Sequence, residues 1–142
     1  MIGLDTNVLA RYYIDDDADD QALQQRVAAR RLIESGQPLL VSKSVILELE
    51  WVMRGYYRFV PAEVASVMHH LLGQTHISIE DRSAVERALS SCEAGIDFAD
   101  ALHHASYSAC ASVATFDDRK FARRAKKLGL MPTVTVLAAR PD

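Results

Sequence analysis

The stretch Ile2-Gly3-Leu4-Asp5-Thr6-Asn7-Val8-Leu9 joins a short apolar run to a helical pattern, with one carboxylate between them. Residues 1–4 have the length and character of a short buried strand, and residues 7–13 continue as a helix. Asp5 therefore follows the carboxyl end of a predicted strand. In open parallel sheets ligands bind at this edge, so Asp5 is a candidate site residue.

The rest of the chain repeats this alternation of short apolar runs and longer periodic segments. Strands are predicted over residues 1–4, 39–42, 76–79, 113–116 and 133–137. Helices are predicted over residues 7–13, 21–34, 44–55, 61–73, 83–92 and 98–111, and in a basic segment that ends at Gly129. Ser44 and Asp97 are expected to cap two of these helices, and Pro61 to begin another. This pattern predicts an α/β fold in three layers, with a mainly parallel central sheet of about five strands and helices on both faces.

The size and composition are those of one ordinary globular domain over residues 1–142. The chain is 49% hydrophobic and 25% charged, with a net charge of −3, and its length allows a substantial core. Cys92 and Cys110 form no C-x-x-C pair, so we expect small core residues in a reducing compartment. Asp5 interrupts the apolar start, and no run is long enough to span a membrane. These observations predict a cytoplasmic protein.

Four carboxylates stand out, and they are spread over the whole chain: Asp5, Glu48, Asp100 and Asp117. Each has an ordinary alternative. Asp5 can cap the first helix, Asp117 or Asp118 can cap the basic helix, and Asp97 with Asp100 has the spacing of a capping box. If the four meet in one cleft, they repel one another, and a divalent cation would neutralise them.

The helix that carries Glu48 is apolar nearly all round, so we expect it to be largely buried. A buried carboxylate needs a partner. Glu50 lies in the same run, and periodicity alone does not choose between the two acids.

Four segments contain these acids: Ile2-Gly3-Leu4-Asp5-Thr6-Asn7-Val8-Leu9, Leu47-Glu48-Leu49, Asp97-Phe98-Ala99-Asp100-Ala101-Leu102 and Ala114-Thr115-Phe116-Asp117. In order and spacing they resemble the four motifs of PIN-domain ribonucleases, over essentially the whole chain. The chain length and the segment Glu48-Leu49-Glu50-Trp51-Val52 are similar to the VapC-type toxins of bacterial toxin–antitoxin pairs. The resemblance favours Glu48 over Glu50, and Asp100 over Asp97, as the inward acids.

The resemblance implies a metal-dependent endoribonuclease that leaves a 3′-hydroxyl and a 5′-phosphate. We expect Asp5 and Asp100 to be the primary ligands of one or two Mg²⁺ or Mn²⁺ ions, with Glu48 and Asp117 completing the acidic cluster. The resemblance also implies a homodimer that is held inactive by a cognate antitoxin.

Several neighbouring polar residues are candidates for supporting roles. Thr6, Asn7 and Thr115 can hold the carboxylates or contact phosphate, or serve as ordinary caps. Arg11, with Arg119 and Lys120 of the basic segment, can attract RNA, although a solvated helix face has the same pattern.

The two adjacent histidines raise the question of zinc. His103 or His104 could share a metal with Asp100, being about one helical turn away. No further His or Cys falls at matching spacing, so magnesium or manganese is the better assignment and the histidines are expected to pack or lie at the surface.

Six aromatic residues lie in the early helices: Tyr12, Tyr13, Trp51, Tyr56, Tyr57 and Phe59. Each is interpreted first as a core residue. Exposed members would instead form an apolar groove suited to an amphipathic partner segment.

Two other functions fit an acid-rich α/β domain. One is a magnesium-dependent phosphatase or phosphotransfer domain, which usually needs a lysine near its aspartate, and Lys43 is the only lysine before residue 120. The other is a non-catalytic binding module whose acids are helix caps.

Overall fold

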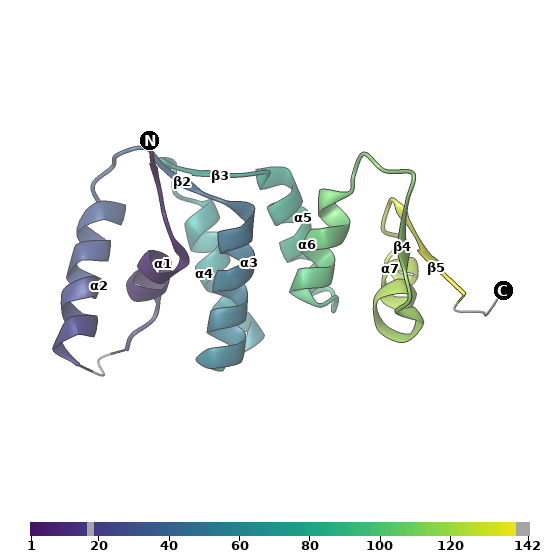
Figure 1. The fold of residues 1–142 in the computed structure, drawn as a ribbon, viewed down its shortest axis with the longest axis horizontal. Helices are drawn as coiled ribbons and strands as arrows, with labels where there is room; N and C mark the ends of the chain where they lie inside the picture. The colour runs from purple at the N-terminus through teal and green to yellow at the C-terminus, as the bar shows by residue number, and fades with distance from the viewer. Residues whose placement is uncertain (17–18, 139–142) are drawn as a thin grey trace. The chain divides into compact units, whose positions relative to one another are not determined.

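The computed structural model describes residues 1–16 and 19–138 (Figure 1). Two compact units make up the chain, Met1–Arg82 and Ser83–Asp142. Five aspartates lie close together at positions 15, 16, 17, 19 and 20, and Asp17 lies outside the described residues. The single domain expected over residues 1–142 stays a prediction.

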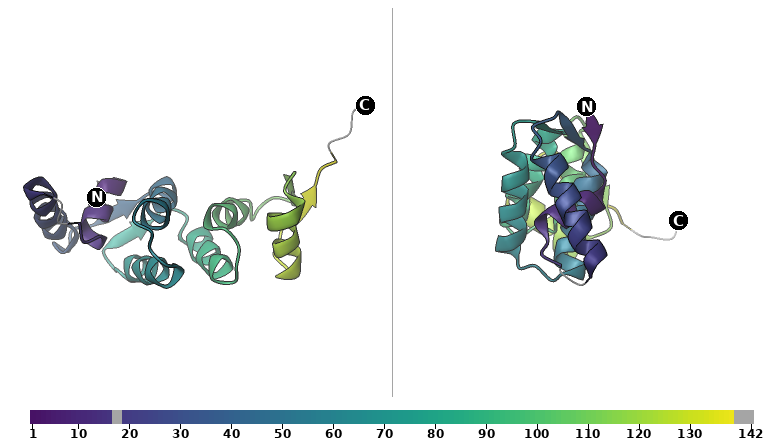
Figure 2. Two further views of the ribbon diagram at one scale, coloured as in Figure 1. Left: turned by 90° about the horizontal axis from the view of Figure 1, so that it is seen from below. Right: turned by 90° about the vertical axis from the view of Figure 1, so that its left-hand side faces the viewer.

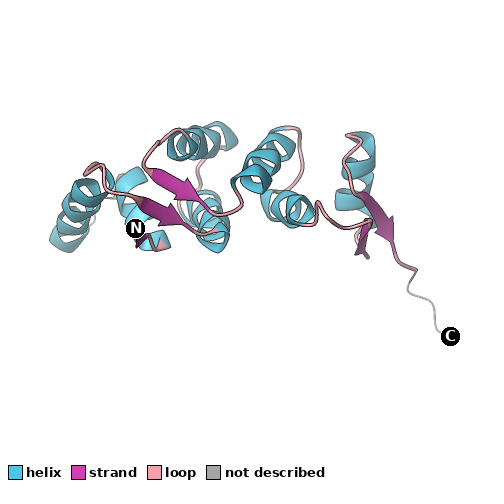
Figure 3. Cartoon of the chain, turned by 90° about the horizontal axis from the view of Figure 1, so that it is seen from above, coloured by secondary structure: helices cyan, strands magenta, loops and turns pink. Residues whose placement is uncertain are grey.

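The first unit is built on a three-stranded parallel sheet. Its elements are β1 (Ile2–Gly3), α1 (Thr6–Tyr13), α2 (Asp20–Ile33), β2 (Leu39–Val41), α3 (Lys43–Trp51), η1 (Val52–Tyr56), α4 (Pro61–Leu72) and β3 (Ile77–Ile79). The strand order is β1-β2-β3, with Ile2 beside Leu39 and Leu39 beside Ile77. Figure 1 shows β2 and β3 running along one end of α1, α3 and α4, and Figure 2 (left) and Figure 3 show these helices end-on. The parallel strands alternate with helices along the chain, as the pattern predicts.

Helix boundaries in the first unit follow from capping chemistry. Asp19 accepts a hydrogen bond from the Ala22 amide at the start of α2. Helix α3 begins after Ser42, whose hydroxyl accepts from the Val45 amide at 3.3 Å. The prediction that Ser44 caps this helix is therefore wrong by two residues, because the backbone turns helical directly after β2.

Pro61 begins α4, as predicted, and the Glu63 carboxylate accepts a hydrogen bond from the Val60 amide at 2.9 Å. A proline suits the first helical position because its missing N–H would have no partner there.

The core of the first unit lies between the sheet and its helices. Leu39 and Val41 of β2 are fully buried, as are Ile46 and Leu49 of α3. Leu9 of α1 is buried with them, and α1 packs against both α2 and α3. Helix α1, which directly follows Asp5, and α3, which carries Glu48, are thus anchored in one core.

The second unit contains a two-stranded parallel sheet. Its elements are α5 (Arg82–Glu93), which begins at the unit boundary, α6 (Phe98–Ser106), β4 (Ser112–Thr115), η2 (Asp118–Ala122), α7 (Arg123–Lys127) and β5 (Thr133–Val136). Strands β4 and β5 pair from Ser112 with Thr133 to Thr115 with Val136. Helix α6 ends at Ser106 and not at the predicted residue 111. The Ser106 hydroxyl donates a hydrogen bond back to the Leu102 carbonyl. Serine favours such local bonds over helix propagation.

Every strand pair in the described chain is parallel, as predicted, but the largest sheet has three strands rather than about five. Cys110 is exposed and Cys92 is half-buried, so the predicted core role is wrong for Cys110. Within residues 1–16 and 19–138, no helix has the length and apolar character that crossing a membrane requires.

Candidate functional site

Asp5 lies at the junction between β1 and α1, where the chain leaves the sheet. Its backbone is extended (φ −81°, ψ 161°), and its Oδ1 accepts a hydrogen bond from the Thr6 amide at 2.7 Å. Asp5 is therefore a helix cap, as the ordinary alternative predicts. A carboxylate has about four lone-pair sites, so this bond leaves most of its capacity for another ligand.

Glu48 lies on α3 and shares an open hollow of about 500 Å³ with Asp5. The expectation that Glu48 is buried is wrong, because its side chain is exposed. The buried acid of this helix is Glu50, whose side chain is 5% exposed and pairs with Arg54 at 2.8 Å. The buried carboxylate of this helix is therefore Glu50, and Arg54 is its partner. Glu48 lines the hollow instead.

Thr6 and Asn7 line the same hollow. Thr6 is 5% exposed, and in the part of the chain that the structure describes its Oγ1 has no hydrogen-bond partner. A buried hydroxyl without a partner costs about 1–3 kcal/mol. The orphaned Oγ1 therefore fits a site that takes up a polar ligand or water beside Asp5.

Arg11 supplies positive charge to this acidic hollow. Its Nε donates to Gln25 Oε1 at 2.8 Å, and its guanidinium lies 3.7 Å from Asp16. Gln25 and Asp16 line the hollow too. Gln25 is not recognisable from local sequence, because it reaches Arg11 only through the packing of α1 against α2.

Aromatic side chains form another wall of the hollow. Trp51 and Tyr56 are 56% and 70% exposed, so the core interpretation is wrong for these two. The ring of Tyr56 lies edge-on to that of Tyr57, with centroids 4.8 Å apart. The Tyr57 hydroxyl donates to Asp16 at 2.9 Å, and burial, followed by this contact, raises the Tyr57 pKa.

In the second unit, Asp100 lies in the first turn of α6. Its amide donates to the capping carboxylate of Asp97 at 3.2 Å. Burial raises the pKa of Asp100, and the charges of Asp97 and Asp117 raise it further, while His103 opposes them. Asp100 and Asp117 therefore lie close enough to repel each other. A cation near Asp100 would relieve this repulsion.

Asp117 follows β4 and caps η2, with its Oδ1 accepting from the Lys120 amide at 2.9 Å. The Thr115 hydroxyl accepts from the Asp117 amide at 3.0 Å. The capping interpretation of Asp117 is therefore confirmed, and Thr115 holds the backbone that carries it. Arg119 and Lys120 are exposed beside this acid.

The histidines of α6 have different surroundings. His104 is buried, with its Nε2 2.8 Å from the Pro132 carbonyl and its ring edge-on to Phe121. This packing role agrees with the expectation. His103 is exposed.

Each unit thus brings together one pair of the four acids. Asp5 and Glu48 share a hollow in the first unit, and Asp100 and Asp117 interact in the second. Over the described residues, neither unit by itself gathers three or more Asp, Glu, His or Cys side chains into a metal site. A cluster of all four acids stays a prediction.

A model of the PIN domain matches residues 2–127, which include all four acids. This chain belongs to the PIN-domain family. No curated protein matches it. PIN domains are generally metal-dependent nucleases and typically use divalent ions. The oxygen-rich lining of the hollow, with its orphaned Thr6 hydroxyl, fits such an ion, because hard divalent cations prefer carboxylate, hydroxyl and amide oxygens.

Proposed function

We propose that this PIN-domain protein is a Mg²⁺- or Mn²⁺-dependent endoribonuclease and the toxin of a toxin–antitoxin pair in the cytoplasm. The observation that carries the proposal is the hollow shared by Asp5 and Glu48. It combines oxygen ligands for a cation, an arginine and exposed aromatic rings. A metal-dependent nuclease acting on a single strand can use all three, for catalysis, phosphate binding and base stacking.

The metal would be held by carboxylates. Asp5 and Asp100 are the proposed primary ligands, and Glu48 and Asp117 complete the cluster. When bound, one or two divalent ions lower the pKa of a water molecule and stabilise negative charge on the phosphorus oxygens. The raised pKa of Asp100 supports this role, because a carboxylate that is repelled by its neighbours gains most from a nearby cation.

The other residues of the hollow would bind and orient RNA. Arg11 can attract a phosphate, and Gln25 fixes the direction of its guanidinium. The exposed rings of Trp51 and Tyr56 offer faces on which bases can stack, a contact worth about 1–3 kcal/mol per base. Stacking needs unpaired bases, so the substrate is single-stranded or looped RNA. Hydrolysis would leave a 3′-hydroxyl and a 5′-phosphate.

The antitoxin and a second copy of this chain are the proposed protein partners. Exposed apolar side chains of the first unit, including Trp51, Tyr56 and Val60, support an amphipathic segment as the antitoxin's contact. Purification of this chain alone, with unchecked activity and no toxicity to its host, would contradict this part of the proposal.

The phosphotransfer alternative has less support. Lys43 pairs with Asp81, with Nζ and Oδ2 3.0 Å apart, so this lysine is engaged away from the acids of the hollow. A binding module whose acids only cap helices would show no metal-dependent activity.

The test is to incubate total RNA with the purified chain, with and without Mn²⁺, and to map the new 5′ ends. We expect Mn²⁺-dependent ends at defined positions that an Asp100→Asn variant does not produce. Equal cleavage by the Asp100→Asn variant would refute the proposal. The absence of new 5′ ends with both Mn²⁺ and Mg²⁺ would refute it too.

A further inference from the structure

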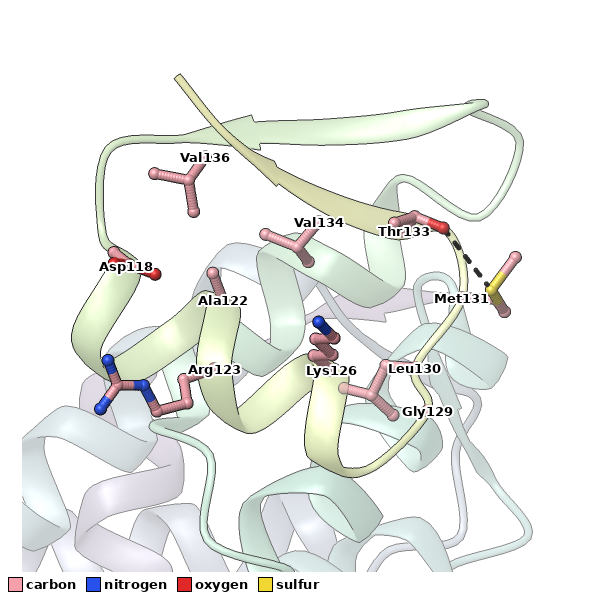
Figure 4. Close-up of a pocket in the computed structure, with 10 residues that line it drawn as sticks. All are labelled: Asp118, Ala122, Arg123, Lys126, Gly129, Leu130, Met131, Thr133, Val134 and Val136. Atoms are coloured by element: carbon pink, nitrogen blue, oxygen red, sulfur yellow. Dashed lines mark hydrogen bonds between the residues drawn. The ribbon is translucent and has the colours of Figure 1, made fainter. Parts of the chain in front are cut away.

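A second hollow, of about 630 Å³, lies entirely within the second unit between η2–α7 and β5 (Figure 4). Its size is in the range of small-ligand sites. None of the four acids lines it, so it is separate from the proposed metal ligands.

The charge of this hollow is mainly positive. Arg123 and Lys126, one turn apart on α7, both line it. Over residues 1–16 and 19–138, no ion pair occupies either side chain. Asp118 also lines the hollow, and its negative charge repels anions at its own end. An anion is therefore favoured at the Lys126 end.

The opposite wall is apolar. Val134 and Val136 are two residues apart on β5, so their side chains point to the same face of the strand. Figure 4 shows both valines on the side of β5 that faces the helix, with Lys126 directed toward the strand. Cations beside an apolar wall match the two parts of a nucleotide, its phosphate and its base.

The positive charge extends along the helical segment beyond the hollow. Arg119 and Lys120 lie on η2, and Arg123 follows them as the first residue of α7. The ten residues of η2 and α7 extend about 15 Å along a helix axis. This length favours a strand with several phosphates over one free nucleotide.

We propose that this hollow is a second contact site for single-stranded RNA, in which Arg123 and Lys126 bind phosphates and the valine wall takes a base. This inference rests on the proposed function, because it assigns one more part of the same substrate. It places a substrate-binding residue pair on α7 that neither capping nor metal binding requires.

The test compares two neighbouring lysines of one helix. Lys126→Gln and Lys127→Gln remove the same charge at exposed positions, but only Lys126 lines the hollow. Binding of a fluorescent single-stranded oligoribonucleotide is measured by anisotropy in EDTA, which prevents metal-dependent cleavage. We expect Lys126→Gln to weaken binding about tenfold and to reduce the slope of log K against log salt by about 0.7. Lys127→Gln should weaken binding less than twofold. Equal effects of the two substitutions would overturn the proposal.

A covalent readout checks the base contact. An oligoribonucleotide containing 4-thiouridine is photocrosslinked to the full chain, and the modified peptide is identified by mass spectrometry. We expect the crosslink within residues 128–138, and a crosslink found only in the first unit would overturn the assignment.

Measuring RNA cleavage by the parent protein distinguishes a failure of this inference from a failure of the proposed function on which it rests. If the parent protein cuts RNA with Mn²⁺ but the two lysine variants bind alike, only the subsite is wrong. If Lys126→Gln alone weakens binding and the parent never cuts, the subsite stands and the nuclease proposal fails.

Discussion

Replacing Arg54 by methionine would test whether Glu50 has a structural role. Arg54 donates three hydrogen bonds to the Glu50 carboxylate, at 2.8, 3.3 and 3.3 Å. Methionine keeps much of the apolar stem but removes the charge and the donors. The substitution therefore leaves an unpaired carboxylate that is 5% exposed.

The cost lies between two limits. Breaking a buried ion pair costs about 3–5 kcal/mol, and breaking an exposed pair costs about 0.2–1 kcal/mol. Glu50 is buried, but 49% of the Arg54 side chain is exposed and solvent screens the pair. We therefore expect a loss of about 2 kcal/mol in the free energy of unfolding, or roughly 6 °C in Tm for a chain of this size.

The assay is urea unfolding followed by the fluorescence of Trp51, which is next to Glu50 in the chain. Arg30→Met is the matched control, because Arg30 and Glu34 form an i,i+4 pair at 4.0 Å with both side chains more than half exposed. It should cost less than about 0.5 kcal/mol. Equal midpoints for the two variants would mean that Glu50 does not depend on Arg54, and the structural role of Glu50 would be refuted.

Three further predictions concern the acids and the start of α3. Glu48→Gln should change the free energy of unfolding by less than about 0.5 kcal/mol, because the side chain is exposed. The same variant should reduce Mn²⁺-dependent RNA cleavage about 100-fold or more in a single-turnover assay. Unchanged cleavage would remove Glu48 from the site. Burial and the nearby carboxylates, Asp117 among them, raise the folded-state pKa of Asp100, so stability falls as pH rises from the ordinary carboxyl range through that raised pKa. Asp100→Asn should therefore raise the Tm of the metal-free protein at pH 7, with a gain that vanishes at lower pH and in excess Mn²⁺; a lower Tm at pH 7 would contradict the repulsion. Ser42→Ala should cost about 1 kcal/mol as the loss of a helix cap, whereas Ser44→Ala should cost much less, and the reverse order in urea unfolding would favour Ser44 as the cap.

Several features of the fold could be predicted because they depend on short-range chemistry. The parallel strands follow from apolar runs separated by helical segments, and Asp5 and Asp117 follow strands because the chain turns polar where it leaves a sheet. Capping by these two residues is equally local, since each accepts a hydrogen bond from an amide within three residues.

The roles of Glu48 and Glu50 could not be read from periodicity, because their helix is apolar on nearly every face. Which acid is buried depends on what packs against each side of α3, and in the structure Glu50 is enclosed while Glu48 lines the hollow with Asp5. The exposure of Trp51 has the same origin, since an aromatic residue in an apolar run is buried only where another element covers it.

The contacts of Arg11 depend most strongly on the tertiary structure. Gln25 is fourteen residues away on another helix and has no local signal that links it to the site. The sequence by itself determined the elements, the acids at their ends and the family, because these depend on neighbours along the chain. The tertiary structure decided which side chains face a hollow and which are paired beneath the surface, because burial and hydrogen bonding depend on residues that only packing brings together.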